Sequence, residues 1–112
     1  MKNLPRNETA ALSLDKGARA PGAVHVTRGE SGVAVTAAVE AGGELLDMTG
    51  CSVAFEWAHR GARGSVAAVV DGTRAAWTLP AFDACGEVES AYLRIVGEAS
   101  TACTNDLRII VR

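Results

Sequence analysis

The chain has 112 residues, with 11 basic and 13 acidic side chains and a formal net charge of −2, so its length suits one compact domain and is too short for two. Hydrophobic residues make up 48% of the sequence, but 21 of these 54 residues are alanine, and the other 33 must build the core. This balance excludes a disordered chain, and the near-neutral charge gives no electrostatic reason to expect nucleic acid or an anionic membrane as a partner.

Between glycines, the apolar residues alternate with a period of two, which places them on one face of a pleated strand. Six segments show this alternation clearly, and two weaker ones, near the start of the chain and after Gly64, fit the same pattern. In chain order, we predict strands over residues 9–14, 23–28, 33–40, 51–58, 65–70, 74–79, 91–96 and 107–112.

Helix is the competing interpretation, because alanine is the best helix former. However, no window of ten or more residues carries apolar positions at helical spacing without an intervening Gly or Pro. Many short strands separated by glycine turns are typical of an antiparallel sandwich or barrel. We therefore predict a single all-β domain over residues 9–112, preceded by a flexible arm of polar residues 1–8.

Three local signals mark the turns between the strands. The Asp47 side chain can accept from backbone N–H groups two residues on, and Gly50 supplies a positive φ. Asp71 and Gly72 join two strand-like runs, which indicates a tight hairpin. Pro80 ends the strand before it, because proline has no N–H to donate to a sheet.

No apolar stretch approaches the roughly 20 residues that span a bilayer. The N-terminus lacks the apolar core of a signal peptide, which indicates synthesis in the cytoplasm. Cys51, Cys85 and Cys103 are odd in number and too widely spaced to indicate a metal site or a disulfide framework, although two of them could pair. We expect three reduced and mostly buried thiols.

No catalytic constellation emerges from the sequence. His25 lies between two inward valines and is expected to face solvent. A nucleophilic pair of His59 with one of the three cysteines is disfavoured, because nothing in the sequence indicates a lowered thiol pKa and Cys51 shares the inward parity of its strand. Glu87 and Glu89 fall on one strand face, where a solvated surface is a simpler interpretation than acid–base chemistry. With no metal-binding or phosphate-binding spacing either, we predict no catalytic residue, metal or cofactor.

Basic side chains concentrate at one place, His59, Arg60 and Arg63, just after the strand 51–58. The cluster lacks the interleaved aromatic residues of a nucleic-acid site. Because arginine is enriched in protein interfaces, we take these three residues as a candidate partner-contact loop. The simpler interpretation is a solvated hairpin tip.

The two tryptophans raise the alternative of a carbohydrate-binding or adhesin-type β-sandwich, since aromatic faces stack on sugars. Trp57 shares the inward parity of Cys51, Val53 and Phe55, and Trp77 shares that of its own strand. We therefore expect both rings in the core, and the carbohydrate module remains the second hypothesis.

The order of several motifs carries a resemblance over about residues 10–112. These motifs are Val24-His25-Val26-Thr27-Arg28-Gly29-Glu30, the strand 33–39, Gly42-Gly43-Glu44-Leu45-Leu46-Asp47-Met48-Thr49-Gly50 followed by Val53 and Phe55, Asp71-Gly72, Trp77-Thr78-Leu79-Pro80, Ala84-Cys85-Gly86, and Leu107-Arg108-Ile109-Ile110-Val111. Together they resemble the N-terminal immunoglobulin-like domain of phage baseplate upper proteins, found in tailed phages of Gram-positive hosts. Glu30 and Met48 depart from the Asp and Leu that are usual there.

The resemblance implies an immunoglobulin-like antiparallel β-sandwich of about seven to nine strands, acting as a non-enzymatic structural adaptor. Such a domain docks host-recognition components onto the tail baseplate of a phage or prophage. The implied partners are other virion or baseplate proteins, and the implied location is the virion. Family members continue into an oligomerising part, whereas this sequence ends at Arg112, after its last predicted strand. We therefore expect a truncated or stand-alone docking module that is monomeric in isolation.

Overall fold

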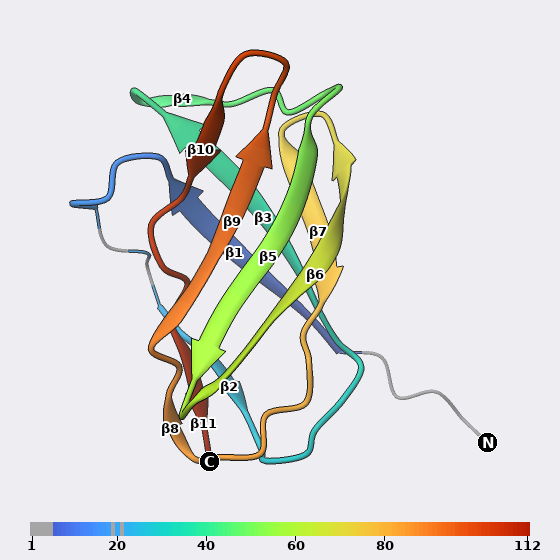
Figure 1. The fold of residues 1–112 in the computed structure, drawn as a ribbon, viewed down its shortest axis with the longest axis vertical. Coiled ribbons are helices and arrows are strands. Elements are labelled where there is room, and N and C mark those ends of the chain that lie inside the picture. The colour runs from blue at the N-terminus through green and yellow to red at the C-terminus, as the bar shows by residue number, and fades with distance from the viewer. Residues whose placement is uncertain (1–5, 19, 21) are drawn as a thin grey trace.

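The computed structural model describes residues 6–18, 20 and 22–112 of the chain. This part consists of strands, turns and loops and contains no helix (Figure 1). Its strands are β1 (Arg6–Ser13), β2 (Val24–Val26), β3 (Val33–Ala41), β4 (Glu44–Leu45), β5 (Ser52–His59), β6 (Ala62–Asp71), β7 (Arg74–Thr78), β8 (Gly86–Glu87), β9 (Ser90–Val96), β10 (Thr101–Cys103) and β11 (Ile109–Val111). The predicted all-β fold class is confirmed.

The strands form one long sheet and one small sheet. The long sheet has the order β1-β3-β7-β6-β5-β9-β10, with β4 paired to β3, and the small sheet has the order β2-β11-β8. Strand β6 carries the long sheet from one layer into the other, because residues 62–68 pair with β5 and residues 69–71 pair with β7. In Figure 1, β5, β6 and β9 lie in front of β1, β3 and β7, which makes the fold a two-layered sandwich.

Two details of the pairing were not predicted. Most neighbouring strands are antiparallel, but β1 runs parallel to β3, and β2 runs parallel to β11. Alternation of apolar residues shows which face of a strand is buried but not which strand lies beside it. Strands β4, β8 and β10 have no predicted counterpart, because two or three residues are too few to show an alternation.

The first strand begins earlier than predicted, since the last three residues of the expected arm belong to β1 and pair with β3. The Arg6 guanidinium donates to the carboxylates of Glu8 and Glu30, at 2.9 and 2.8 Å, and to the carbonyl oxygen of His25. These contacts explain why a polar run is held in the sheet. The rest of the predicted arm, residues 1–5, lies outside the described residues.

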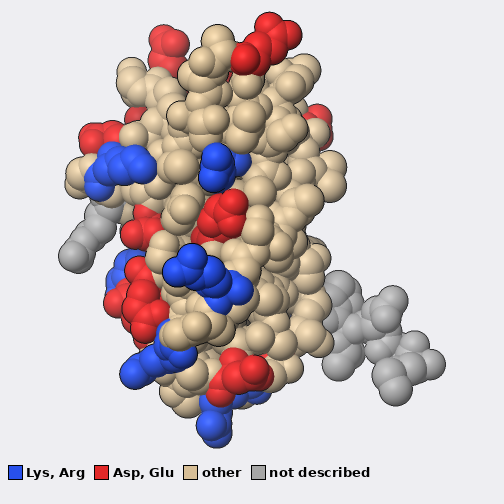
Figure 2. Space-filling view, viewed as in Figure 1, with Lys and Arg blue, Asp and Glu red and all other residues tan. Residues whose placement is uncertain are grey.

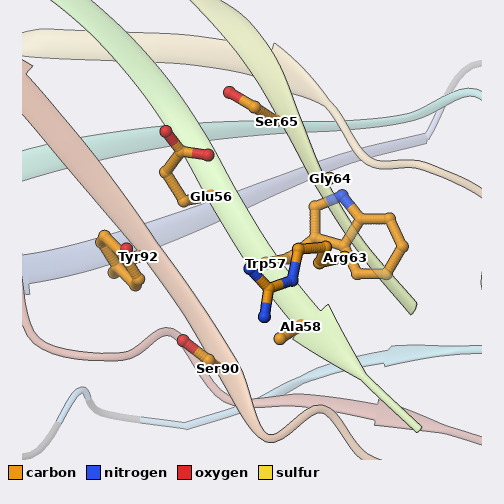
Figure 3. Close-up of a pocket in the computed structure, with 8 residues that line it drawn as sticks. All are labelled: Glu56, Trp57, Ala58, Arg63, Gly64, Ser65, Ser90 and Tyr92. Carbon is orange, nitrogen blue, oxygen red and sulfur yellow. The ribbon is translucent and has the colours of Figure 1, made fainter. Parts of the chain in front are cut away.

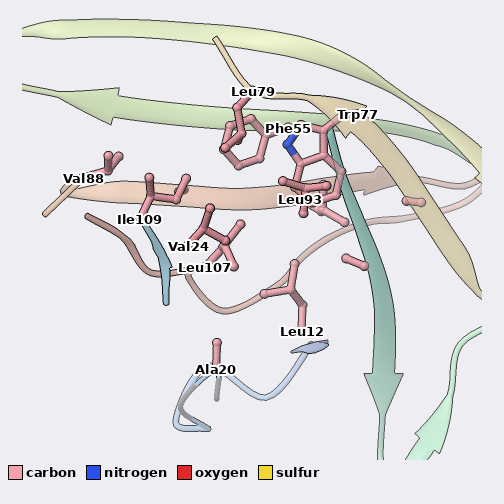
Figure 4. Close-up of a cluster of buried hydrophobic side chains, with 14 of the residues drawn as sticks. Leu12, Ala20, Val24, Phe55, Trp77, Leu79, Val88, Leu93, Leu107 and Ile109 are labelled. Atoms are coloured by element: carbon pink, nitrogen blue, oxygen red, sulfur yellow. The ribbon is translucent and has the colours of Figure 1, made fainter. Parts of the chain in front are cut away.

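The core lies between the two layers and follows the predicted alternation. Phe55 of β5 stacks on Trp77 of β7 across the layers, with ring centroids 5.0 Å apart and planes 20° from parallel. Figure 4 shows both rings close to Leu79 and Leu93. Other buried apolar side chains are Leu12, Val24, Val26, Val33, Val35, Val39, Met48, Val53, Phe82, Val88, Ile95, Leu107, Ile109 and Val111. Removing this apolar set from water is the main force that holds the layers together.

The turn signals at Asp47 and Asp71 are confirmed, and the strand before Pro80 ends at Thr78, one residue earlier than predicted. The backbone N–H and the hydroxyl of Thr49 donate to the Asp47 carboxylate at 3.0 and 2.6 Å, and Gly50 has a φ of 82°. These bonds hold the pKa of Asp47 below its usual value, and the bond from the Thr49 hydroxyl has the larger effect. Asp71 pairs with Arg74 where β6 turns into β7.

A buried asparagine fastens the end of β1 to the segment after β10. The Asn105 Oδ1 accepts from the Ser13 N–H at 2.9 Å, and the Asn105 N–H donates to the Ser13 carbonyl oxygen at 2.8 Å. The Nδ2 group of Asn105 donates to the carbonyl oxygen of Ala18 at 2.9 Å. One side chain thus joins segments 92 positions apart in the sequence.

Candidate contact surface

The β5–β6 hairpin carries the three residues that the sequence singled out. His59 ends β5 and pairs with Ala62, which leaves Arg60 and Gly61 as the two-residue connection. Both have a positive φ, 51° at Arg60 and 84° at Gly61, as a type I′ hairpin turn requires. Glycine adopts this conformation freely, whereas arginine does so at an energetic cost.

The neighbouring loop holds Arg60 in this conformation. The Arg60 backbone N–H donates to the Glu89 carboxylate at 2.8 Å, and this bond is the main cause that lowers the pKa of Glu89. The guanidinium lies against Gly86, where Nη2 is 2.8 Å from the place a Cβ would take. Arg60 is therefore exposed but directed toward the Gly86 turn.

His59 does not lie at the surface. The residue is 3% exposed, and its ring packs edge-on against Phe82 with centroids 5.9 Å apart. Its Nε2 lies 2.8 Å from the Ala84 carbonyl oxygen, which can only accept, so Nε2 carries the hydrogen. Its Nδ1 lies 3.6 Å from Glu89 Oε2. The expectation of a surface imidazole at a loop tip is wrong, because the loop that follows β7 folds over the ring.

Arg63 is exposed and lies on the outer face of the front layer, where β5 sits between β6 and β9. The strand register places Arg63, Ala58 and Ser90 in one row across this face. The three basic residues therefore do not form one cluster. His59 is inside, Arg60 covers a turn, and Arg63 belongs to the sheet face.

This outer face is hollowed into an open groove of about 390 Å³, which we call the β5–β6–β9 groove (Figure 3). Its lining residues are Glu56, Trp57, Ala58, Arg63, Gly64, Ser65, Ser90 and Tyr92. The small side chain of Ala58 leaves room between the larger side chains, whereas the space beside Gly64 is taken by the Trp57 indole. In Figure 3 the Arg63 guanidinium extends toward Ala58, and the Glu56 carboxylate points away from it.

The polar side chains of the groove have no ionic or side-chain hydrogen-bond partner among residues 6–18, 20 and 22–112. Among the described residues, Glu56 and Arg63 take part in no ion pair. In the same part of the chain, the hydroxyls of Ser65, Ser90 and Tyr92 make no hydrogen bond to protein. Acidic and basic side chains are interspersed on this face of the molecule (Figure 2). The groove therefore offers free donors and acceptors rather than a field of one sign.

Sequence reasoning named Arg63 but missed the other polar residues of the groove. The alternation of β5 and β9 does predict that Glu56 and Tyr92 face outward. What brings them together is the register, in which Glu56 lies directly opposite Tyr92 and also opposite Ser65. No pattern within one strand reports this register.

The remaining chemical candidates lie apart from one another. The described part of the chain holds no group of His, Cys, Asp and Glu arranged to bind a metal ion. Cys51 and Cys103 are half-buried, and Cys85 is exposed, so the expectation of mostly buried thiols is wrong for Cys85. All three thiols are free. His25 is exposed, as predicted.

The two tryptophans lie in different environments. Trp77 is 4% exposed and belongs to the core, as predicted. Trp57 is only half-buried, and its indole packs edge-on against Phe82 with centroids 5.3 Å apart. Its parity is as predicted, but it lies at the open flank of the sandwich, where the loop after β7 covers it incompletely.

No helix in the described part of the chain is long and apolar enough to span a membrane. No family model matches the sequence. No curated protein matches it significantly.

The fold is similar to a solved structure, the N-terminal domain of phage TP901-1 ORF48. The TM-score is 0.75 at 16% sequence identity, and the match covers 96% of this chain and 98% of that chain. The two chains therefore share one fold over nearly their whole length. This match confirms the sandwich that the motifs implied, and it comes, like the resemblance, from an N-terminal domain of a phage protein.

Proposed function

We propose that this protein is a non-enzymatic structural adaptor of a phage or prophage tail, which docks host-recognition components onto the baseplate. The observation that carries the proposal is the near-complete structural match to the N-terminal domain of phage TP901-1 ORF48. The motif order that resembles baseplate upper proteins points independently to the same role. The site of action is then the virion tail, after synthesis in the cytoplasm of the bacterial host.

The surface supports protein partners over other classes. A net charge of −2 and interspersed charges on the viewed face give no attraction to nucleic acid or to an anionic membrane (Figure 2). Exposed Arg60 and Arg63, on the hairpin and on the sheet face, are the kind of side chain enriched in interfaces. Docking through such residues requires shape and charge complementarity and no reaction centre.

The test is to purify tails after prophage induction and to locate this chain in them. Mass spectrometry is expected to find the protein in the tail fraction together with other tail proteins. Immunogold electron microscopy is expected to place it at the distal end of the tail. Recovery of the protein only from the soluble fraction, while other tail proteins sediment as particles, would overturn the proposal.

A further inference from the structure

The β5–β6–β9 groove contains charged and polar side chains that are not paired within the described part of the chain. They differ in this from Arg108, which donates to Glu87 at 2.7 Å, and from Arg6, which donates to Glu30 at 2.8 Å. In the groove, Glu56 is half-buried and has no ionic partner among the described residues. Partly removing a carboxylate from water without pairing it is unfavourable unless something else binds there.

The free groups of the groove match a ligand whose own groups both donate and accept. Arg63 supplies N–H donors, and Glu56 supplies carboxylate acceptors. The hydroxyls of Ser65, Ser90 and Tyr92 can do either. One positive and one negative charge cancel, so the groove has no net attraction for a phosphate or another anion.

An aromatic ring and an open floor complete the groove. Tyr92 is half-buried beside Glu56, so its ring combines an apolar face with a polar end. Ala58 adds no bulky group to the floor, and the volume of about 390 Å³ exceeds that of a single sugar ring. The apolar C–H face of a saccharide fits against such a ring while its hydroxyls reach the polar groups.

We propose that the β5–β6–β9 groove is a binding site for a neutral saccharide, with Tyr92 as the stacking ring and with Glu56 and Arg63 as hydrogen-bonding groups. This activity goes beyond the adaptor role and does not depend on it. It also differs from a platform built on the two tryptophans, since Trp77 is enclosed in the core.

The test uses the full chain, labelled with ¹⁵N, in NMR titrations. The probes are glucose, galactose, mannose and N-acetylglucosamine, followed by maltose, lactose, cellobiose and chitobiose. At least one probe is expected to shift the amide signals of β5, β6 and β9 around the groove, with a dissociation constant on the order of 0.1–10 mM, as befits an open site.

Two variants and a matched control make the test specific. Tyr92→Ala and Arg63→Met are each expected to weaken binding at least about tenfold, which corresponds to about 1.4 kcal/mol. Arg94→Met removes an exposed arginine of β9 that does not line the groove and is expected to bind like the parent chain. Amide spectra of each variant without saccharide verify that the fold is kept.

Two results would overturn the proposal. One is the absence of shifts at the groove with all eight probes at about 50 mM, well above the expected range. The other is binding that survives Tyr92→Ala in a folded variant. If the groove variants instead fail to enter tails while no saccharide binds, the groove is a protein-docking surface, and the adaptor role stands without the saccharide site.

Discussion

The indole of Trp57 occupies the space that a side chain at position 64 would need. A Cβ on Gly64 would lie 2.7 Å from the indole Nε1 and 2.9 Å from two of its ring carbons. Trp57 and Gly64 are direct cross-strand partners in the β5–β6 ladder. The glycine is therefore a packing requirement of the tryptophan.

Gly64→Ala is expected to destabilise the fold by about 1–3 kcal/mol, because the new methyl group displaces a ring packed against Phe82. The measurement is urea unfolding followed by circular dichroism. The matched control is Gly97→Ala, where the new Cβ meets its nearest atom, the Ser100 carbonyl oxygen, at an ordinary 3.6 Å. Equal midpoints for the two variants would show that the indole moves aside at no cost.

The two tryptophans are expected to differ in their access to solvent. In Trp57→Phe, the remaining Trp77 is enclosed and should resist quenching by acrylamide. In Trp77→Phe, the half-buried Trp57 should be quenched more strongly. The measurement is the slope of fluorescence quenching in each variant. The reverse order would contradict the packing of both rings.

Asn105→Ala is expected to destabilise the domain by about 1–3 kcal/mol, because it leaves the Ser13 N–H and the Ala18 carbonyl oxygen without their side-chain partner. Hydrogen exchange of the Ser13 amide should accelerate in the variant, in addition to the shift in urea unfolding. Asn7→Ala, on the exposed side of the same strand β1, serves as the control. Unchanged exchange at Ser13 would mean that Asn105 does not fasten β1.

Acid is expected to weaken the turn around Asp47. Thr49 holds the pKa of the Asp47 carboxyl below its unfolded value, so the charged form stabilises the fold above about pH 4. This contribution is lost as the pH falls through the lower pKa of the folded state. Asp47→Ala should therefore lose stability at pH 6 relative to the parent chain, and the difference should shrink toward pH 2.

The matched control for this acid effect is Asp83→Ala. Asp83 is exposed and accepts no hydrogen bond from a side chain or turn among the described residues. Urea unfolding at pH 6 and at the lowest pH where the fold persists measures both variants. A stability loss for Asp47→Ala that is the same at both pH values would contradict the role of its charge.

The three thiols differ in exposure, so we expect them to react with a labelling reagent at different rates. Cys85 is expected to react with a thiol reagent before Cys51 and Cys103, because only Cys85 is exposed. Mass spectrometry of the native protein at early times identifies the labelled residue. First labelling at Cys51 or Cys103 would contradict the packing described for those strands.

Strand β6 shows which part of a strand's extent can be predicted from the sequence. We predicted a strand over residues 65–70 that begins after Gly64, because glycine marks a break between strands. The signal is weak, because the valines of this segment do not share one face. The structure instead runs β6 from Ala62 to Asp71 through the glycine. The reason is the Trp57 indole on the neighbouring strand β5, which leaves no room for a Cβ at position 64.

In the candidate site, too, the sequence predicted some residues correctly and missed the effect of tertiary packing on another. Sequence alone placed Arg63 and Arg60 after the strand 51–58, and the structure finds both exposed. It also grouped His59 with them, although the loop after β7 buries that ring against Phe82. A loop that folds back from elsewhere in the chain leaves no trace in the residues next to the histidine.

The sequence by itself determined the all-β class, the buried face of the longer strands other than β6 and the turns at Asp47 and Asp71, because these depend on local chemistry and on a period of two. Only the tertiary structure decided the parallel pairing of β1 with β3, the burial of His59 and the convergence of Glu56, Arg63 and Tyr92 on one groove. Those features depend on which strands become neighbours and in which register. That choice is made by packing the whole core at once, so no single segment encodes it.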